Sequence, residues 1–148
     1  MDNVFESFTY SILKLNKLIH KIKLTEMQAY GLKTIHVMCV YYLYKSGGMT
    51  HTELTESTLE DKAAISRAVK CLKEKNLICG GVDGYKSKYK LTDEGKALAE
   101  VIYEQSEKAV KAASCDFTEE ERREFYKSLS SIAEKLQNYY NELSEEKA

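Results

Sequence analysis

The sequence predicts a mainly α-helical fold with one small β-hairpin. Of the 148 residues none is proline and only seven are glycine, so long loops and all-β architectures have few of the residues that they need. Apolar residues recur at helical spacing near both ends, and Asp83-Gly84 separates two short extended runs. The length, with 43% apolar and 30% charged residues, indicates one folded domain over residues 1–148.

Each end of the chain carries an apolar heptad pattern on one helix face. The N-terminal stripe consists of Phe5, Phe8, Ile12, Leu15, Ile19 and Ile22. The C-terminal stripe consists of Phe125, Leu129, Ile132, Leu136, Tyr139 and Leu143, on a helix that a capping box of Thr118 and Glu121 begins. Each stripe needs a partner helix, from the same chain or from a second copy, and the spacing alone leaves both alternatives open.

The next predicted helices have different surroundings. A helix over about residues 32–45 is apolar nearly all round, which predicts burial, and Gly47-Gly48 ends it. Thr50 and Glu53 form a capping box for a short helix that stops near Leu59. Asp61 is a good N-cap for a second helix, whose apolar face holds Ile65, Val69 and Leu72. Asn76 suits the exit of this helix, and the pair predicts a helix-turn-helix.

Positive charge concentrates in the centre of the chain. Residues 60–90 contain eight basic and four acidic residues, whereas the remainder contains 14 basic and 19 acidic residues. This asymmetry predicts contact with a polyanion. The predicted face opposite the apolar side of the second helix carries Lys62, Ala63, Ser66, Arg67, Lys70 and Lys73.

These residue types suit the major groove of DNA. Ala63 and Ala64 are small, so the backbone can approach a groove floor or a thymine methyl group. Ser66 and Arg67 can reach base edges, and arginine grips guanine with two hydrogen bonds. Lysines at 70 and 73 suit phosphates. A merely solvated face is the alternative, and the absence of acids between residues 62 and 73 makes it less attractive.

The extended runs 77–82 and 85–91 flank Asp83-Gly84 and predict a hairpin, called here the wing. Lys86, Lys88 and Lys90 alternate with Tyr85, Tyr89 and Leu91. We expect Lys86 and Lys88 to contact the sugar-phosphate backbone or the minor groove. Thr92 then caps a long helix that ends near Ala113.

This order resembles the MarR family of bacterial transcription regulators. The strings that carry the resemblance are Met49–Leu54 (MTHTEL), Asp61–Val69 (DKAAISRAV), Leu72–Ile78 (LKEKNLI) and Leu91–Lys96 (LTDEGK). The resemblance implies a winged helix-turn-helix over residues 49–92 and a helical dimerisation region over residues 1–46 and 93–148. It also implies a sequence-specific, double-stranded DNA-binding homodimer that acts on a near-palindromic operator, most often as a repressor.

Two positions depart from the family pattern. The family's wing carries an arginine that enters the minor groove, whereas this wing tip, Asp83-Gly84-Tyr85-Lys86, contains no arginine. Lys86 or Lys88 would have to substitute, and lysine fits a narrow groove differently. Asn76 stands where the family has glycine, and asparagine accepts left-handed backbone geometry.

Members of this family typically respond to a small molecule, a metal or an oxidant. Tyr10, Tyr30, His36 and Tyr41 are the candidate ligand-binding residues, with core packing as the alternative. His36 and Cys39 have the spacing to share a metal on one helix, but no second pair lies nearby in sequence, so we expect core residues and no metal site. Cys71 and Cys79 are more simply explained as apolar fillers than as thiol sensors.

Several function classes lack their sequence signals. There is no nucleophile elbow, phosphate loop or HExxH motif, so we expect neither an enzyme nor a cofactor. The four cysteines form no CxxC pair and no signal peptide or membrane span is visible, which predicts a reduced, cytoplasmic protein. The alternative function is a winged-helix module that binds another protein without DNA.

Overall fold

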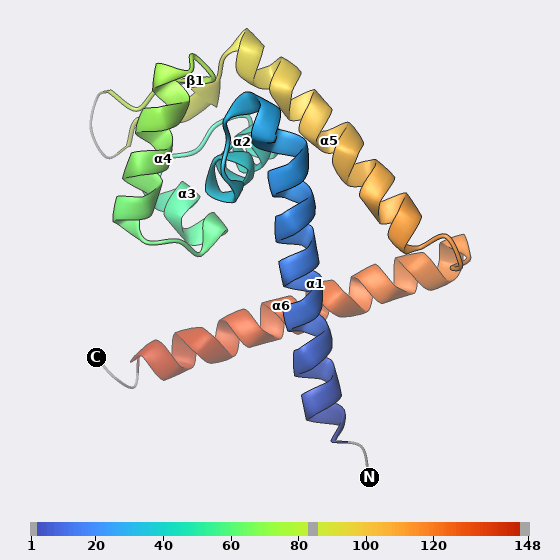
Figure 1. The fold of residues 1–148 in the computed structure, drawn as a ribbon. Helices are drawn as coiled ribbons and strands as arrows, with labels where there is room; N and C mark the ends of the chain where they lie inside the picture. The colour runs from blue at the N-terminus through green and yellow to red at the C-terminus, as the bar shows by residue number, and fades with distance from the viewer. Residues whose placement is uncertain (1–2, 83–85, 146–148) are drawn as a thin grey trace. The chain divides into compact units, whose positions relative to one another are not determined.

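The computed structural model describes residues 3–82 and 86–145. Its helices are α1 (Val4–Met27), α2 (Thr34–Ser46), α3 (His51–Thr58), α4 (Lys62–Glu74), α5 (Asp93–Ala113) and α6 (Glu119–Glu145), with a short 3₁₀ turn, η1 (Gln28–Tyr30), after α1. Strands β1 (Ile78–Gly80) and β2 (Tyr89–Leu91) pair antiparallel. The predicted class, mainly α with a small β-hairpin after a helix-turn-helix, is confirmed (Figure 1).

The described chain forms two compact units, Met1–Ser106 and Glu107–Ala148. The first contains α1 to β2 and most of α5. The second contains the end of α5 and all of α6.

Local side chains begin the helices, as the sequence predicts. The Thr50 hydroxyl accepts from the Glu53 backbone N–H at 3.2 Å, and the Glu53 carboxylate accepts from the Thr50 N–H at 2.7 Å. The Asp61 carboxylate accepts from the Ala64 N–H at 2.7 Å to begin α4. At α6 the Thr118 hydroxyl likewise accepts from the Glu121 N–H at 3.2 Å. These bonds satisfy amide groups that have no partner inside the helix.

Left-handed residues end the helices of the first unit. Gly47, with φ 74°, ends α2, and Leu59, with φ 58°, ends α3. Asn76 has φ 56° just after α4, which confirms its predicted role. Asparagine tolerates this conformation better than leucine does, so Leu59 is the more strained of the two non-glycine residues.

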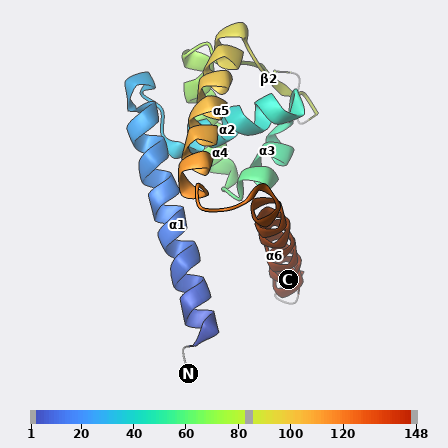
Figure 2. The ribbon, with the colours of Figure 1, turned by 90° about the vertical axis from the view of Figure 1, so that its right-hand side faces the viewer.

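The core of the first unit forms around α2, which contacts α3, α4 and β2 (Figure 1, Figure 2). Its largest fully buried side chains are Leu43, Leu54, Ile65, Leu72, Val40 and Cys39. The predicted burial of the helix over residues 32–45 is therefore confirmed. A buried glycine, Gly95, brings the start of α5 against β1, because a Cβ at this position would overlap the Leu77 carbonyl oxygen.

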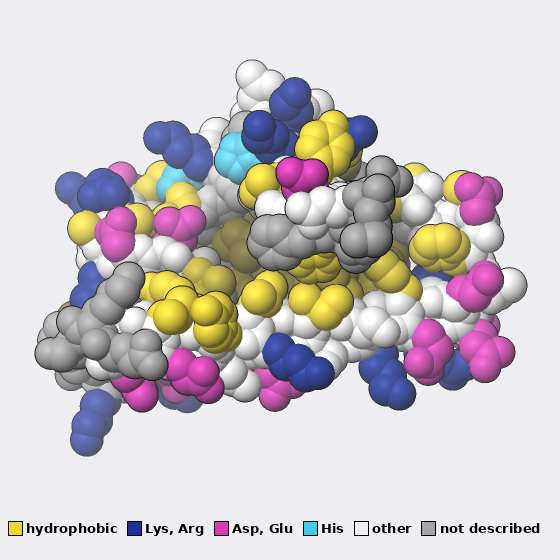
Figure 3. Space-filling model, turned by 90° about the horizontal axis from the view of Figure 1, so that it is seen from below, with side chains coloured by type: hydrophobic (Ala, Val, Ile, Leu, Met, Phe, Trp, Pro, Cys, Tyr) yellow, Lys and Arg dark blue, Asp and Glu magenta, His cyan; other side chains and the backbone are white. Residues whose placement is uncertain are grey.

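The stripe residues that the structure describes are mostly open to solvent within the single chain. In the C-terminal stripe Leu136 is 55% exposed, and α6 has no buried residue. In the N-terminal stripe Ile19 is 50% exposed, and the Phe5 side chain lies outside the described residues. Figure 3 shows apolar side chains open to solvent on one face of the molecule. Within residues 3–82 and 86–145, no helix combines the length and apolar character needed to cross a bilayer.

Candidate nucleic-acid interface

Helix α4 separates an apolar face from a basic one. The side chains of Ile65, Ala68, Val69 and Leu72 are buried against the core. The opposite face is exposed and carries six of the predicted DNA-binding residues: Lys62, Ala63, Ser66, Arg67, Lys70 and Lys73. Ala64, also predicted to approach DNA, is half-buried. The buried face fixes the rotation of the helix, so the direction of the basic face follows from core packing.

The charges on this face are not neutralised by neighbouring acids. In the part of the chain that the structure describes, the ion pair found is Lys96–Asp93 on α5, with 3.3 Å between nitrogen and oxygen. Lys62, Arg67 and Lys70 therefore present unpaired cations to solvent. A cluster of such charges on one convex helix attracts a polyanion.

The Lys73 side chain contacts an aromatic ring. Its ammonium nitrogen lies 5.2 Å from the centroid of the Tyr89 ring, a cation–π contact between α4 and β2. The side chain is still exposed. Lys70 is the other α4 lysine that is predicted to bind phosphate. It makes no cation–π contact with any residue that the structure describes.

The Ser66 hydroxyl group is hydrogen-bonded within α4. It donates to the Lys62 carbonyl oxygen at 2.9 Å, and its oxygen lies 3.5 Å from Nε2 of His51. With its hydrogen engaged, this oxygen can accept from a base edge but not donate to one. The sequence did not indicate His51 as a neighbour of this face.

The wing ladder is shorter than the sequence predicts. Ile78 pairs with Leu91, Cys79 with Lys90 and Gly80 with Tyr89, and the pairing stops there. Gly80 and Gly81 have φ 84° and 71°, a left-handed succession that turns the chain away from a strand. The predicted turn at Asp83-Gly84, and Tyr85, lie outside the described residues.

Lys86 and Lys88, the two predicted wing contacts, are exposed but lie before β2 rather than in it. The predicted alternation of exposure runs from Lys86 to Leu91, but the predicted strand pairing holds only from Tyr89 onward. There, Tyr89 is buried, Lys90 is exposed and Leu91 is half-buried.

The four candidate ligand-binding residues are not gathered at one place. Tyr10 is 66% exposed on α1, and the Tyr41 ring packs edge-on against Tyr42 with centroids 5.7 Å apart. His36 is buried, and its Nδ1 accepts from the Lys33 backbone N–H at 3.0 Å. His36 thus serves as a helix cap. Burial, with the charges of Lys33 and Lys75, lowers its pKa.

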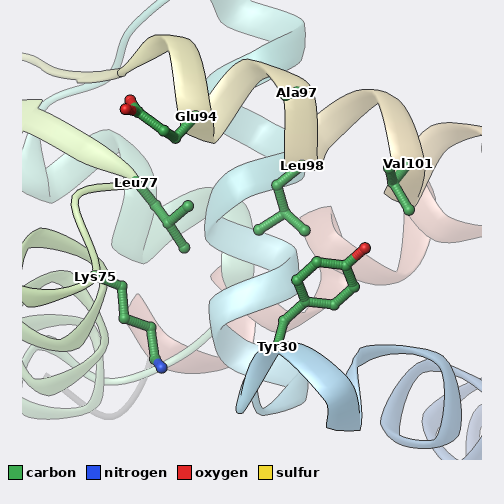
Figure 4. Close-up of a pocket in the computed structure, with 7 residues that line it drawn as sticks. All are labelled: Tyr30, Lys75, Leu77, Glu94, Ala97, Leu98 and Val101. Atoms are coloured by element: carbon green, nitrogen blue, oxygen red, sulfur yellow. The ribbon is translucent and has the colours of Figure 1, made fainter.

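Tyr30 does line a pocket, of about 530 Å³, between the end of α4, the start of β1 and α5. Its other lining residues are Lys75, Leu77, Glu94, Ala97, Leu98 and Val101. Figure 4 shows the Tyr30 ring near Leu98 and Val101, with the charged ends of Lys75 and Glu94 on the other side of the pocket. The walls are mostly apolar, with one cationic and one anionic group at the edge. Sequence reasoning identified Tyr30 alone among these residues.

The cysteines differ in their exposure to solvent. Cys39 is fully buried, and burial raises its pKa to about 12, which leaves a neutral and unreactive thiol. Cys71 is half-buried, and Cys79 is exposed. Among the described residues, no group of three or more His, Cys, Asp or Glu side chains is arranged to hold a metal ion.

Comparison with known proteins identifies the fold. No protein-family model and no curated protein matches the sequence. Solved structures do match. A MarR protein from Peptoclostridium difficile is 16% identical, with a TM-score of 0.85 over 97% of this chain and 95% of that one. A MarR transcriptional regulator from Methanosarcina mazei is 20% identical, with a TM-score of 0.84 over 94% of each chain.

A third similar structure is the MepR–DNA complex of S. aureus. It is 17% identical, with a TM-score of 0.74 over 87% of this chain and 97% of that one. At such low identity these matches establish the fold. The chain has the winged helix-turn-helix fold of the MarR regulators, and the resemblance stated from the sequence is confirmed at this level.

Proposed function

We propose that the protein is a homodimeric, sequence-specific, double-stranded DNA-binding transcription regulator. The observation that carries the proposal is the exposed basic face of α4, which the buried core aims outward and which no described acid neutralises. The S. aureus MepR structure with the same fold is a complex with DNA. The similar M. mazei structure is named as a MarR transcriptional regulator, so we propose a regulator and not an enzyme.

In this proposal the segment 61–75 enters the major groove. Arg67 reads a base edge with two hydrogen bonds, and Ser66 accepts a hydrogen bond beside it. Ala63 allows close approach to the groove floor, with half-buried Ala64 behind it. The lysines at 62, 70 and 73 neutralise phosphates, and Lys86 and Lys88 contact the backbone beside the groove.

The two apolar stripes support a dimer. Their exposed leucines, isoleucines and aromatic residues would be costly to leave in water, and a second copy can cover them. We assign the dimerisation region to residues 1–46 and 93–148 and the DNA-binding region to residues 49–92. A two-fold dimer places its two α4 helices about one DNA turn apart, or roughly 34 Å. The operator is then nearly palindromic.

Regulation by a small molecule is part of the proposal. The pocket beside Tyr30 has a volume of about 530 Å³, which is in the range of small-ligand sites. A ligand there would touch both the end of α4 and the start of α5. Such a ligand would release DNA only if its affinity for the DNA-binding conformation of the dimer differed from its affinity for another conformation. We propose that the unliganded protein represses transcription in a bacterial cytoplasm.

Selection from a random duplex pool tests this function. The full chain is mixed with the pool at low salt, the bound duplexes are amplified, and their affinity is measured by gel shift against scrambled sequences. We expect enrichment of two inverted half-sites about 10 base pairs apart. Arg67→Ala should weaken this affinity, whereas Arg123→Ala, at an exposed α6 position, is the matched arginine control and should leave it unchanged.

Two results would contradict the proposal. A chain that shifts no duplex at low salt would favour the protein-interaction alternative. Equal affinity for selected and scrambled duplexes would leave only non-specific binding.

A further inference from the structure

Tyr89 connects three parts of the DNA-binding region. Its backbone pairs with Met49 just before α3, through N–H to oxygen bonds of 3.1 and 2.7 Å. Its ring is covered on one side by Gly81, where a Cβ would overlap the ring, and it contacts the Lys73 ammonium of α4. The residue is only 9% exposed. The base of the wing, the start of α3 and the end of α4 therefore meet at one residue.

His51 extends this connection to the beginning of α4. Its Nδ1 lies 3.3 Å from the Tyr89 hydroxyl and its Nε2 lies 3.3 Å from the Lys62 carbonyl oxygen. A carbonyl oxygen only accepts, so Nε2 carries the hydrogen, and in the neutral ring Nδ1 accepts from Tyr89. Burial raises the pKa of Tyr89, so its hydroxyl remains a donor at neutral pH.

Within the described residues, Lys86 and Lys88 are joined to the rest of the DNA-binding region only through a short strand pair. Each strand has three residues, and Lys86 and Lys88 precede the ladder. A ladder this short fixes the position of an attached segment poorly. The distance between these lysines and the basic face of α4 therefore depends on the Tyr89 and His51 contacts.

We propose that Tyr89 and His51 are positioning residues for DNA binding, which hold the wing lysines at the spacing from α4 that one duplex requires. This inference rests on the proposed function. Neither side chain needs to touch DNA. A duplex contacts α4 and the wing together, so a loosened wing costs ordering entropy on binding and weakens the phosphate contacts of Lys86 and Lys88.

A double-mutant cycle tests the inference. Tyr89→Phe keeps the ring and removes the hydroxyl that donates to His51. Its effect on the affinity for a selected duplex is measured in the wild-type chain and in the Lys86→Ala, Lys88→Ala chain. Tyr44→Phe, at a 42% exposed tyrosine of α2, is the matched control. Thermal unfolding of each variant is measured in parallel.

We expect Tyr89→Phe to weaken binding roughly 2- to 10-fold in the wild-type chain, the range for one lost hydrogen bond. In the chain without the two lysines the same change should cost less than about 2-fold, because the residues act through one another. Tyr44→Phe should change neither value. His51→Phe, which removes both ring nitrogens but keeps the aromatic contact, should behave as Tyr89→Phe does.

Equal losses in the two backgrounds would overturn the inference, because a side chain that only packs acts independently of the wing lysines. An unchanged affinity of both variants would overturn it as well. These results leave the proposed function intact, since the wild-type chain still binds. A wild-type chain that binds no duplex would contradict both this inference and the proposed function.

Discussion

The core around α2 in the first unit and helix α6 bury their apolar residues very differently. In the first unit Leu54, Ile65 and Leu72 have no exposed surface, and α2 lies among them. Helix α6 repeats its apolar residues just as regularly, yet none of its residues is buried. Regularly spaced apolar residues are thus covered by other helices around α2, whereas those of α6 are left open to solvent in the single chain.

This difference separates folding from assembly. The core around α2 supplies the first unit with the apolar burial that folding requires. The C-terminal stripe contributes little to a single chain, because exposed apolar surface is not removed from water. Covering it by a second copy would place its stabilisation in the dimer.

Leu136→Glu, in the exposed stripe of α6, should have the largest effect. A carboxylate in a covered stripe would be buried without a partner, which costs about 3–5 kcal/mol. We expect monomers or unfolded chains by light scattering after gel filtration, together with loss of duplex binding. Ser131→Glu, at another exposed α6 position, is the control and should remain dimeric. A stable Leu136→Glu dimer would show that this stripe does not form the dimer interface.

Leu54→Ala tests the other side of the comparison. Removing this fully buried side chain leaves a cavity, so unfolding in urea should show a loss of about 2–5 kcal/mol. Leu59→Ala, at a neighbouring leucine that is 73% exposed, should change stability by less than ~0.5 kcal/mol. Similar losses for the two variants would mean that the core around α2 does not carry the stability.

Arg67→Ala should change DNA binding without changing the core around α2 or the α6 stripe. Its side chain is exposed, so stability should be unaltered. The affinity for the selected duplex should fall by about 1–3 kcal/mol, and one base preference should relax. Fluorescence anisotropy with single-base variants of the duplex measures both effects. A loss of equal size on unrelated DNA would show that Arg67 contacts phosphate only.

The smallest predicted effect is a pH dependence of the stability of the first unit. Burial lowers the pKa of His36, so the folded state favours the neutral ring. The stability that this gives is complete above the unfolded pKa, about 6.5, and falls as the pH drops from there toward the folded value. His36→Gln, which keeps an acceptor for the Lys33 N–H, should flatten the melting temperature between pH 7.5 and 5.

The features that the sequence predicted correctly are local. The N-caps at Thr50, Asp61 and Thr118, the left-handed Asn76 and the two faces of α4 each depend on residues within a few positions of one another. Side-chain caps and helical periodicity act over this same range. The basic face could therefore be located before any tertiary contact was known.

The features that sequence reasoning missed depend on long-range packing. His51 and Tyr89 are 38 positions apart, and Tyr30 meets Leu98 only after α5 folds back. The ladder length was overestimated because alternation in residues 85–91 predicts a strand, whereas the left-handed glycines at 80 and 81 end the pairing. The capping role of His36 was also missed, since Ser, Thr, Asp and Asn are the usual signals.

The salt dependence of duplex binding measures whether the basic face of α4 and the wing lysines contact DNA phosphates. The wild-type chain is titrated onto a duplex labelled at one end, at several salt concentrations between about 50 and 200 mM. The basic face of α4 and the wing predict that the logarithm of the affinity falls linearly with the logarithm of salt, with a slope that Lys86→Ala and Lys88→Ala each reduce by up to about one unit. Binding that is absent at the lowest salt, or a slope that neither substitution changes, would contradict the proposed interface.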